Sequence, residues 1–140
     1  MHATPDELLE LDVVDGAGRA TKVRVAIYGV TGARVVVTRG DRVWEAEGED
    51  LLVCLVNVRQ QLEADGLILC CQGARPDVWP SGQLRQFTNG RFGYVLASPS
   101  IGRAPETVNL FAPADAREIG TIEEQRAAVF RFHGLRQSPG

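Results

Sequence analysis

The residue types that most often build catalytic and metal sites are scarce in this sequence. Its 140 residues include two histidines, one methionine and three cysteines. With only His2 and His133 present, a histidine-rich metal site is excluded, and a Ser-His-Asp triad would have to use His133. A GxSxG elbow, a P-loop and an HExxH motif are all missing from the sequence. We therefore expect a protein that is not an enzyme and that holds no cofactor or metal.

The cysteines do not fit a disulfide framework. Cys54, Cys70 and Cys71 make an odd number, two of them are adjacent, and no CxxC pair exists. All three lie in apolar runs, which is typical of buried, reduced thiols. The N-terminal stretch lacks the basic and apolar regions of a signal peptide, and no apolar run is long enough to span a membrane. We therefore expect a cytoplasmic protein that does not bind membranes.

Neither sign of charge is in large excess. Fifteen Lys and Arg face eighteen Asp and Glu, which gives a formal net charge of −3. This balance does not favour nucleic acid or anionic lipid as a partner. The length is that of one domain, and the composition, 44% hydrophobic and 24% charged, is ordinary for a globular protein. We expect a single domain over residues 1–140, with fraying at 1–6 and 135–140.

Two β-hairpins are predicted near the N-terminus, because apolar and polar residues alternate on both sides of two turns. In the first hairpin the apolar positions pair Val13 with Val23, which puts Asp12 opposite Arg24 on the other face. Opposite charges across the ladder support this register.

The second hairpin is predicted from its turn. Gly40-Asp41 is the Gly-X pair of a type II′ turn between the strands Arg34–Thr38 and Val43–Glu47. A two-residue turn pairs Val37 with Trp44 on the core face, so Trp44 is expected in the core.

The clearest helix follows, over residues 50–65. Its apolar residues form one continuous stripe, and they are Leu51, Leu55, Val58 and Leu62. Asp50 is the expected N-cap, and Gly66 is the expected residue after the C-cap. The run that follows, residues 67–71, is apolar on both faces and predicts a central strand covered on both sides.

The C-terminal half predicts two further strands and a second main helix. We expect strands over residues 91–97 and 107–111, with a loop over 98–105 between them. Thr121 and Glu124 form a capping box at the start of the last helix. Its expected buried residues are Ile122, Val129 and Phe132. The predicted fold is α+β: an antiparallel sheet built from two N-terminal hairpins plus a central strand, with two main helices packed mostly on one face.

The stretch after the central strand is the candidate functional segment. Long loops at strand ends often carry binding sites, and two prolines stiffen this one. Its candidate binding residues are Arg75, Asp77, Trp79, Ser81 and Arg85. Ser81 is expected to cap a short helix whose free N–H groups, beside Arg75 and Arg85, could bind an anion. Trp79 is expected to stack on a ligand or anchor an interface.

A structural interpretation of the same segment stays open. Arg75 and Asp77 then form a local ion pair, Ser81 only caps, and Trp79 packs on the edge of a sheet. Acidic residues at the two helix starts are an alternative contact surface for a basic partner, or a solvated patch. They are Glu45, Glu47, Glu49, Asp50, Asp115, Glu118, Glu123 and Glu124.

Two segments of the C-terminal half carry a resemblance. The first is residues 74–82 (ARPDVWPSG) together with Gly93-Tyr94, and the second is residues 114–126 (ADAREIGTIEEQR). Together they resemble a family of short bacterial proteins, some of them encoded beside secreted or polymorphic toxins. The resemblance implies a small bacterial binding protein with an immunity role, and it assigns no catalytic residue.

The function expected from these observations is a non-enzymatic protein-binding module, most concretely a cytoplasmic immunity protein that binds and neutralises a bacterial toxin. A small-molecule or nucleotide-binding domain that uses the Arg75–Arg85 loop is the alternative. An enzyme built on carboxylates or on Cys70 and Cys71 is a third hypothesis. Pairing of an open sheet edge with a second copy of the chain also stays open.

Overall fold

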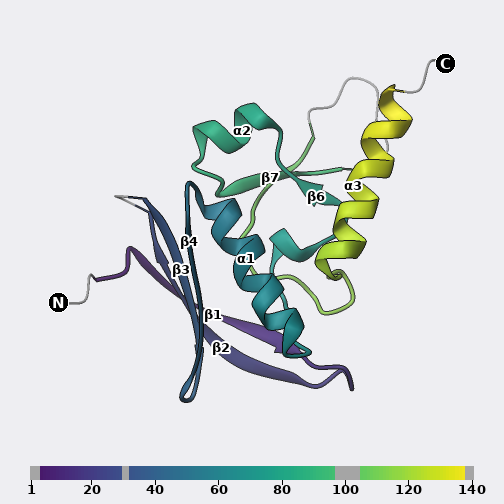
Figure 1. The fold of residues 1–140 in the computed structure, drawn as a ribbon. Helices are drawn as coiled ribbons and strands as arrows, with labels where there is room; N and C mark the ends of the chain where they lie inside the picture. Colours follow the sequence, from purple (N-terminus) through teal and green to yellow (C-terminus); the bar gives the residue numbers. More distant parts are fainter. Residues whose placement is uncertain (1–3, 30–31, 97–104, 138–140) are drawn as a thin grey trace.

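The structure, a computed structural model, describes residues 4–29, 32–96 and 105–137. Within these residues the chain forms two antiparallel sheets and three α-helices (Figure 1). The strands are β1 (Glu7–Val14), β2 (Ala20–Tyr28), β3 (Ala33–Arg39), β4 (Arg42–Gly48), β5 (Ile68–Leu69), β6 (Val78–Trp79), β7 (Phe92–Val95) and β8 (Thr107–Asn109). The helices are α1 (Leu51–Ala64), α2 (Gly82–Phe87) and α3 (Ile122–Gln137), with a 3-10 turn over Gln72–Ala74.

The predicted α+β class is confirmed. The large sheet has the strand order β4-β3-β2-β1-β5 and is antiparallel throughout. Helix α1 packs on one face of this sheet, against β3 and β4. In Figure 1 the other two helices lie on the same side as α1, farther from the sheet. The small sheet, in the order β6-β7-β8, lies with them.

The predicted central position of the strand after α1 is wrong. That segment forms only the short strand β5, which pairs with β1 at one edge of the large sheet. Beyond it the chain bonds to the C-terminal half: Gly73 N–H donates to the Leu110 carbonyl at 2.8 Å, and Cys71 bridges to Pro113. The apolar side chains of residues 67–71 are therefore covered in part by a distant segment of the chain. An apolar pattern cannot distinguish such cover from that of a neighbouring strand.

The register of the first hairpin differs from the prediction by two residues. Leu11 pairs with Val23, and Asp12 pairs with Lys22 rather than with Arg24. The connection is shorter than the predicted pairing implies, because Val14 pairs with Ala20. The Asp15 carboxylate closes this turn by accepting hydrogen bonds from the N–H groups of Ala17 and Arg19, both at 2.9 Å. A shift of two leaves every side chain on its predicted face. The Lys22–Asp12 ion pair, at 2.8 Å, is exposed and contributes little.

The second hairpin is confirmed in register and in turn. Val37 pairs with Trp44, and Arg34 pairs with Glu47. Gly40 has φ of +61°, as the first central residue of a type II′ turn requires. Trp44 is 4% exposed and donates from Nε1 to Asp65 Oδ2 at 2.7 Å, so its predicted place in the core is also confirmed.

Helix α1 has the predicted buried stripe and both predicted end signals. Asp50 accepts from the Val53 N–H at 2.9 Å, which caps the first turn. Gly66 has φ of +78°, and Leu67 N–H donates back to the Leu62 carbonyl at 2.9 Å, which is a Schellman ending. The stripe of Leu51, Leu55, Val58 and Leu62 is buried against the large sheet.

Helix α3 begins with the predicted capping box: Thr121 N–H donates to Glu124 Oε1, and Glu124 N–H donates to Thr121 Oγ1. Its predicted buried stripe is wrong, because Ile122, Val129 and Phe132 are only half-buried. The helix packs on α1 and β6 rather than on the large sheet, so one side of it faces an open groove. None of the described helices is long and apolar enough to cross a bilayer.

The two strands of the C-terminal half are shorter than predicted, and the loop expected over 98–105 lies almost entirely outside the described residues. The fraying expected at 1–6 and 135–140 also falls partly outside them. Of the described part, Asp6 accepts from Gly29 N–H at 2.6 Å, and α3 continues to Gln137.

Candidate functional site

Arg75 is engaged within its own segment. Its Nε and Nη2 donate to the two carboxylate oxygens of Asp77, at 3.0 and 2.8 Å, and its Nη1 donates to Gln72 Oε1 at 2.8 Å. The hydrogen bonds from Arg75 to Asp77 raise the pKa of Arg75. This geometry favours the structural interpretation of the Arg75–Asp77 pair, in which the pair shapes the loop.

Arg85 is engaged with a residue far away in sequence. Its Nε donates to Asp50 Oδ2 at 2.5 Å, so the short helix α2 is fastened to the start of α1. Partial burial raises the pKa of Asp50, but the hydrogen bonds from Arg85 and from Val53 N–H outweigh it and leave the pKa below its usual value of 3.8. Arg75 and Arg85 thus each have a carboxylate partner, and the structure does not join them in an anion site.

Ser81 caps α2, as predicted. Its Oγ accepts from the Leu84 N–H at 3.1 Å, and the helix ends at Phe87. The helix has only six residues and buries none of them fully, and Phe87 is 80% exposed. The role that the structure supports for Ser81 is to start this helix, which carries Arg85 to Asp50.

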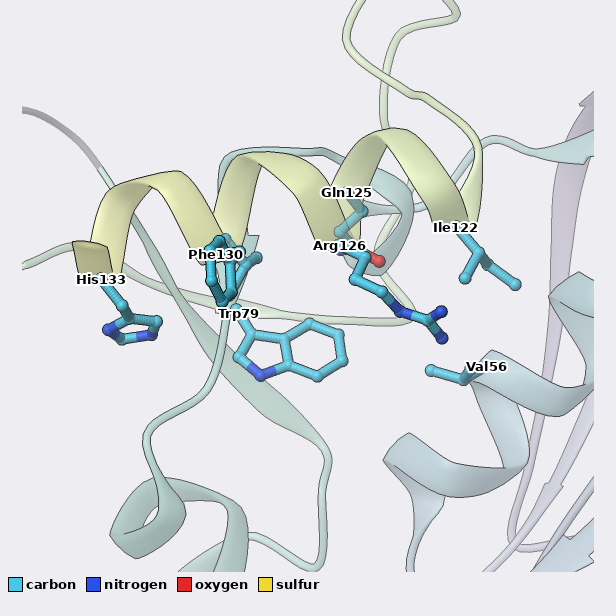
Figure 2. A pocket seen from close by; sticks show the side chains of 8 residues that line it. Val56, Trp79, Ile122, Gln125, Arg126, Phe130 and His133 are labelled. Atoms are coloured by element: carbon cyan, nitrogen blue, oxygen red, sulfur yellow. The ribbon is translucent and has the colours of Figure 1, made fainter. Parts of the chain in front are cut away.

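Two of the predicted site residues line hollows of ligand size in the described chain. Arg85, bonded to Asp50, lines a hollow of about 350 Å³ between the starts of α1 and α2. Trp79 lines another, of about 340 Å³, which we name the α3 groove. It is lined by Val56 of α1, by Trp79 of β6, and by one face of α3 that presents Ile122, Arg126, Phe130 and His133, with Gln125 and Val129 completing the lining. Figure 2 shows the α3 side chains pointing toward Trp79 and Val56 across the groove.

Two buried polar residues hold the base of the α3 groove in place. The Gln125 amide, 2% exposed, donates from Nε2 to the carbonyls of Gly73, Arg75 and Val78, at 2.9, 2.9 and 3.0 Å. These bonds fix α3 to the chain directly before Trp79. Because all three hydrogen bonds come from the one Gln125 amide, the position of Trp79 relative to α3 is set before any partner binds.

Arg59 of α1 completes this network. It is 1% exposed, and its guanidinium donates to Gln125 Oε1 at 2.5 Å, to the Gly73 carbonyl at 2.9 Å and to the Gly120 carbonyl at 3.3 Å. Burial lowers the pKa of Arg59. A guanidinium here joins α1, the 3-10 turn and the start of α3 through one side chain.

The sequence did not point to Phe130, Arg126 or His133 as site residues. Phe130 is 80% exposed and follows Val129 on a mostly polar helix. A large apolar residue at such a position is the sequence signal that could have pointed to it. Gln125 and Arg59 gave no signal, because a polar residue on a helix is usually solvated.

The predicted acidic surfaces are largely paired within the molecule. Glu45 accepts from Arg34 at 2.7 Å, and Asp50 is bonded to Arg85. Hydrogen bonds from Arg117 lower the pKa of Asp115 to about 2. Glu124 belongs to the capping box of α3. These contacts weaken the acidic patches as candidate contact surfaces.

The cysteines have no features of a reactive site. Cys54, Cys70 and Cys71 are free and buried, and burial raises the pKa of each thiol to about 11. A thiol with such a pKa is protonated at neutral pH and is a poor nucleophile. Among the described residues, no cluster of His, Cys, Asp or Glu side chains is arranged to hold a metal ion.

Comparison with known proteins adds no family to these observations. No protein-family model matches the chain, and no curated protein matches its sequence. The geometry of the α3 groove is therefore the basis for the functional conclusion.

Proposed function

We propose that this protein is a non-enzymatic protein-binding module and that the α3 groove is its contact surface. The observation that carries the proposal is that Trp79 and Phe130, from separate elements, open onto one apolar hollow. Large aromatic side chains at an apolar groove, here the exposed Phe130 and the half-buried Trp79, are the usual anchors of a protein interface. The other candidate residues of the loop, by contrast, have partners inside the molecule.

The rigidity of the α3 groove supports binding of a preformed partner surface. The amide of Gln125 and the guanidinium of Arg59 fix Trp79 relative to α3. A surface that is already ordered loses little conformational entropy on binding, so more of the contact energy remains as affinity.

The more specific role that we propose is that of a cytoplasmic immunity protein that neutralises a bacterial toxin. The support is the resemblance of two segments to short bacterial proteins encoded beside toxins. Both segments contribute to the α3 groove: residues 74–82 contain Trp79, and residues 114–126 contain Ile122, Gln125 and Arg126.

A nucleotide site on the Arg75–Arg85 loop has less support. A phosphate would have to displace Asp77 from Arg75 and Asp50 from Arg85, which would also remove contacts that hold the loop and α2.

The proposal is tested by co-expressing the protein with the product of the adjacent gene and measuring affinity and rescue of growth. Phe130→Ser is expected to weaken the complex about 30-fold, which corresponds to the roughly 2 kcal/mol of an interface hot spot. Phe87→Ser is the matched control, because Phe87 is also 80% exposed but does not line the α3 groove. A complex that both variants weaken equally, or no complex at all, contradicts the proposal.

A further inference from the structure

The α3 groove is mostly apolar, but a positively charged side chain also lines it. Of its eight lining residues, all in the described part of the chain, none is Asp or Glu, and Arg126 is the one Arg or Lys among them. In Figure 2 the Arg126 guanidinium reaches from α3 toward Val56 and the space beside Trp79. An apolar partner that carries a carboxylate at this level would be complementary to the groove.

Arg126 is available for such a partner. The carboxylate of Glu123 lies 3.9 Å from its Nη1, which is beyond hydrogen-bond distance, and both side chains are largely exposed. A partner carboxylate that forms two parallel hydrogen bonds with the guanidinium would bind it more strongly than Glu123 does.

Acidic residues that are not part of its lining lie near the Ile122 end of the α3 groove. Glu63 Oε2 accepts from the Ile122 N–H at 3.0 Å, and Glu123 and Glu124 belong to the same first turn of α3. Arg126 follows Ile122 by one helical turn, and in Figure 2 its guanidinium lies on the Ile122 and Val56 side of the groove, away from His133. A partner carboxylate therefore fits at the Arg126 guanidinium and is repelled by the carboxylates at the start of α3.

The length of the α3 groove matches a short helix. Its lining runs along α3 from Ile122 to His133. Eleven residue steps at the rise of an α-helix correspond to about 16 Å, or three turns of a partner helix. Val56 of α1 forms the far side, so the groove lies between two helices, where apolar residues at i, i+4 and i+7 of a third helix can pack.

Building on the proposed protein-binding function, we propose that the partner presents an acidic amphipathic α-helix to the α3 groove. Its apolar residues pack on Trp79 and Phe130, and a carboxylate at the edge of its apolar face pairs with Arg126. The occupant is thus a helical segment of a protein, with a carboxylate at a defined place on its surface.

The test uses the full chain, labelled with ¹⁵N, and two synthetic three-turn helical peptides. Both peptides have Leu at i, i+4 and i+7; one has Glu beside the Leu stripe and the other has Lys at the same positions. The two indole N–H signals report separately, because Trp79 lines the α3 groove whereas Trp44 is buried and bonded to Asp65. The Glu peptide is expected to shift the Trp79 signal and leave that of Trp44 in place.

Charge reversal supplies the sharper measurement. The Glu peptide is expected to bind wild-type protein about fivefold more tightly than the Lys peptide, the upper range for an exposed ion pair. Arg126→Glu is expected to reverse this preference. Arg131→Glu is the matched control, because Arg131 is an exposed residue of the same helix that does not line the α3 groove.

Three results would overturn the inference: no shift of the Trp79 signal with the Glu peptide, equal affinities for both peptides, or the same response in both arginine variants. A shift with dodecanoate and with neither peptide would assign the α3 groove to a small amphiphile instead. The peptide experiment does not use the adjacent gene product, so the two proposals can fail separately. If the peptides bind without charge preference while the complex with the adjacent gene product still depends on Phe130, the helix inference is refuted and the proposed function stands.

Discussion

The large-sheet region and the α3 region differ in how far their apolar side chains are buried. On the inner face of the large sheet, Val25 and Val35 are fully buried. Leu8 and Val43 are exposed on its other face, but as single residues, which is ordinary. Around α3, by contrast, Phe130 stands exposed beside a half-buried Trp79 on a shared groove. The first region builds the buried core, and the second presents the surface for which we propose binding.

One network connects the two regions. Arg59 projects from the core helix α1 to Gln125 of α3, and both are nearly fully buried. The α3 region therefore depends on the core region for its position, whereas the hairpins of the large sheet do not depend on α3.

The largest expected effect comes from breaking this network. Arg59→Ala leaves Gln125 Oε1 and the Gly120 carbonyl without this donor in a buried site and removes one of the two donors to the Gly73 carbonyl. We therefore expect a loss of about 3 kcal/mol in the free energy of unfolding. Chemical denaturation measures it. Arg131→Ala, at an exposed position of α3, should stay within about 0.5 kcal/mol of wild type. A loss below about 1 kcal/mol for Arg59→Ala would mean that α3 holds its place without the network.

A smaller effect is expected at Asp50, which caps α1 and binds Arg85. Asp50→Ala removes both contacts and should cost about 1.5 kcal/mol, whereas Asp50→Asn keeps a capping oxygen and should cost less. The pKa of Asp50 is depressed in the folded state, so its stabilising contribution is present above pH 3.8 and is lost as pH falls through the folded pKa. Denaturation at pH 7 and near pH 2 measures the difference between wild type and Asp50→Asn. That difference should shrink at the lower pH, and a constant difference would contradict an ionised Asp50–Arg85 pair.

The smallest effect on stability is expected at Phe130. Because its side chain is 80% exposed, Phe130→Ser should change the free energy of unfolding by no more than about 0.5 kcal/mol. Thermal or chemical unfolding measures this change. A substantial loss of stability would show that Phe130 supports the fold, and the contrast between the two regions would then fail.

The elements that sequence reasoning predicted best depend on contacts between neighbours in the chain. The type II′ turn at Gly40 sets the register of β3 and β4 because a two-residue turn leaves no freedom in pairing. The register of the first hairpin differs by two residues because the Asp15 side chain closes a shorter connection than predicted, and the alternation of apolar and polar residues does not fix the length of a connection. Both outcomes follow from how strongly each turn restricts the backbone.

The candidate site was predicted only in part, for a related reason. Trp79 was singled out as an unusual residue in a stiff loop, and it does line the α3 groove. The partner of Arg85 is Asp50, 35 positions earlier in the chain, and the partner of Arg59 is Gln125, 66 positions later. Side chains that meet across such separations leave no periodic signal in one sequence.

By itself the sequence determined the α+β class, the second hairpin, the limits of α1 and the capping box of α3, because hydrophobic period, turn chemistry and end caps act over a few residues. Only the tertiary structure decided that β5 lies at an edge, that Arg75 and Arg85 are occupied by carboxylates, and that Trp79 and Phe130 share one groove. Those outcomes depend on which distant segments the packing of the core brings together, and burial, unlike a turn, is a property of the whole fold.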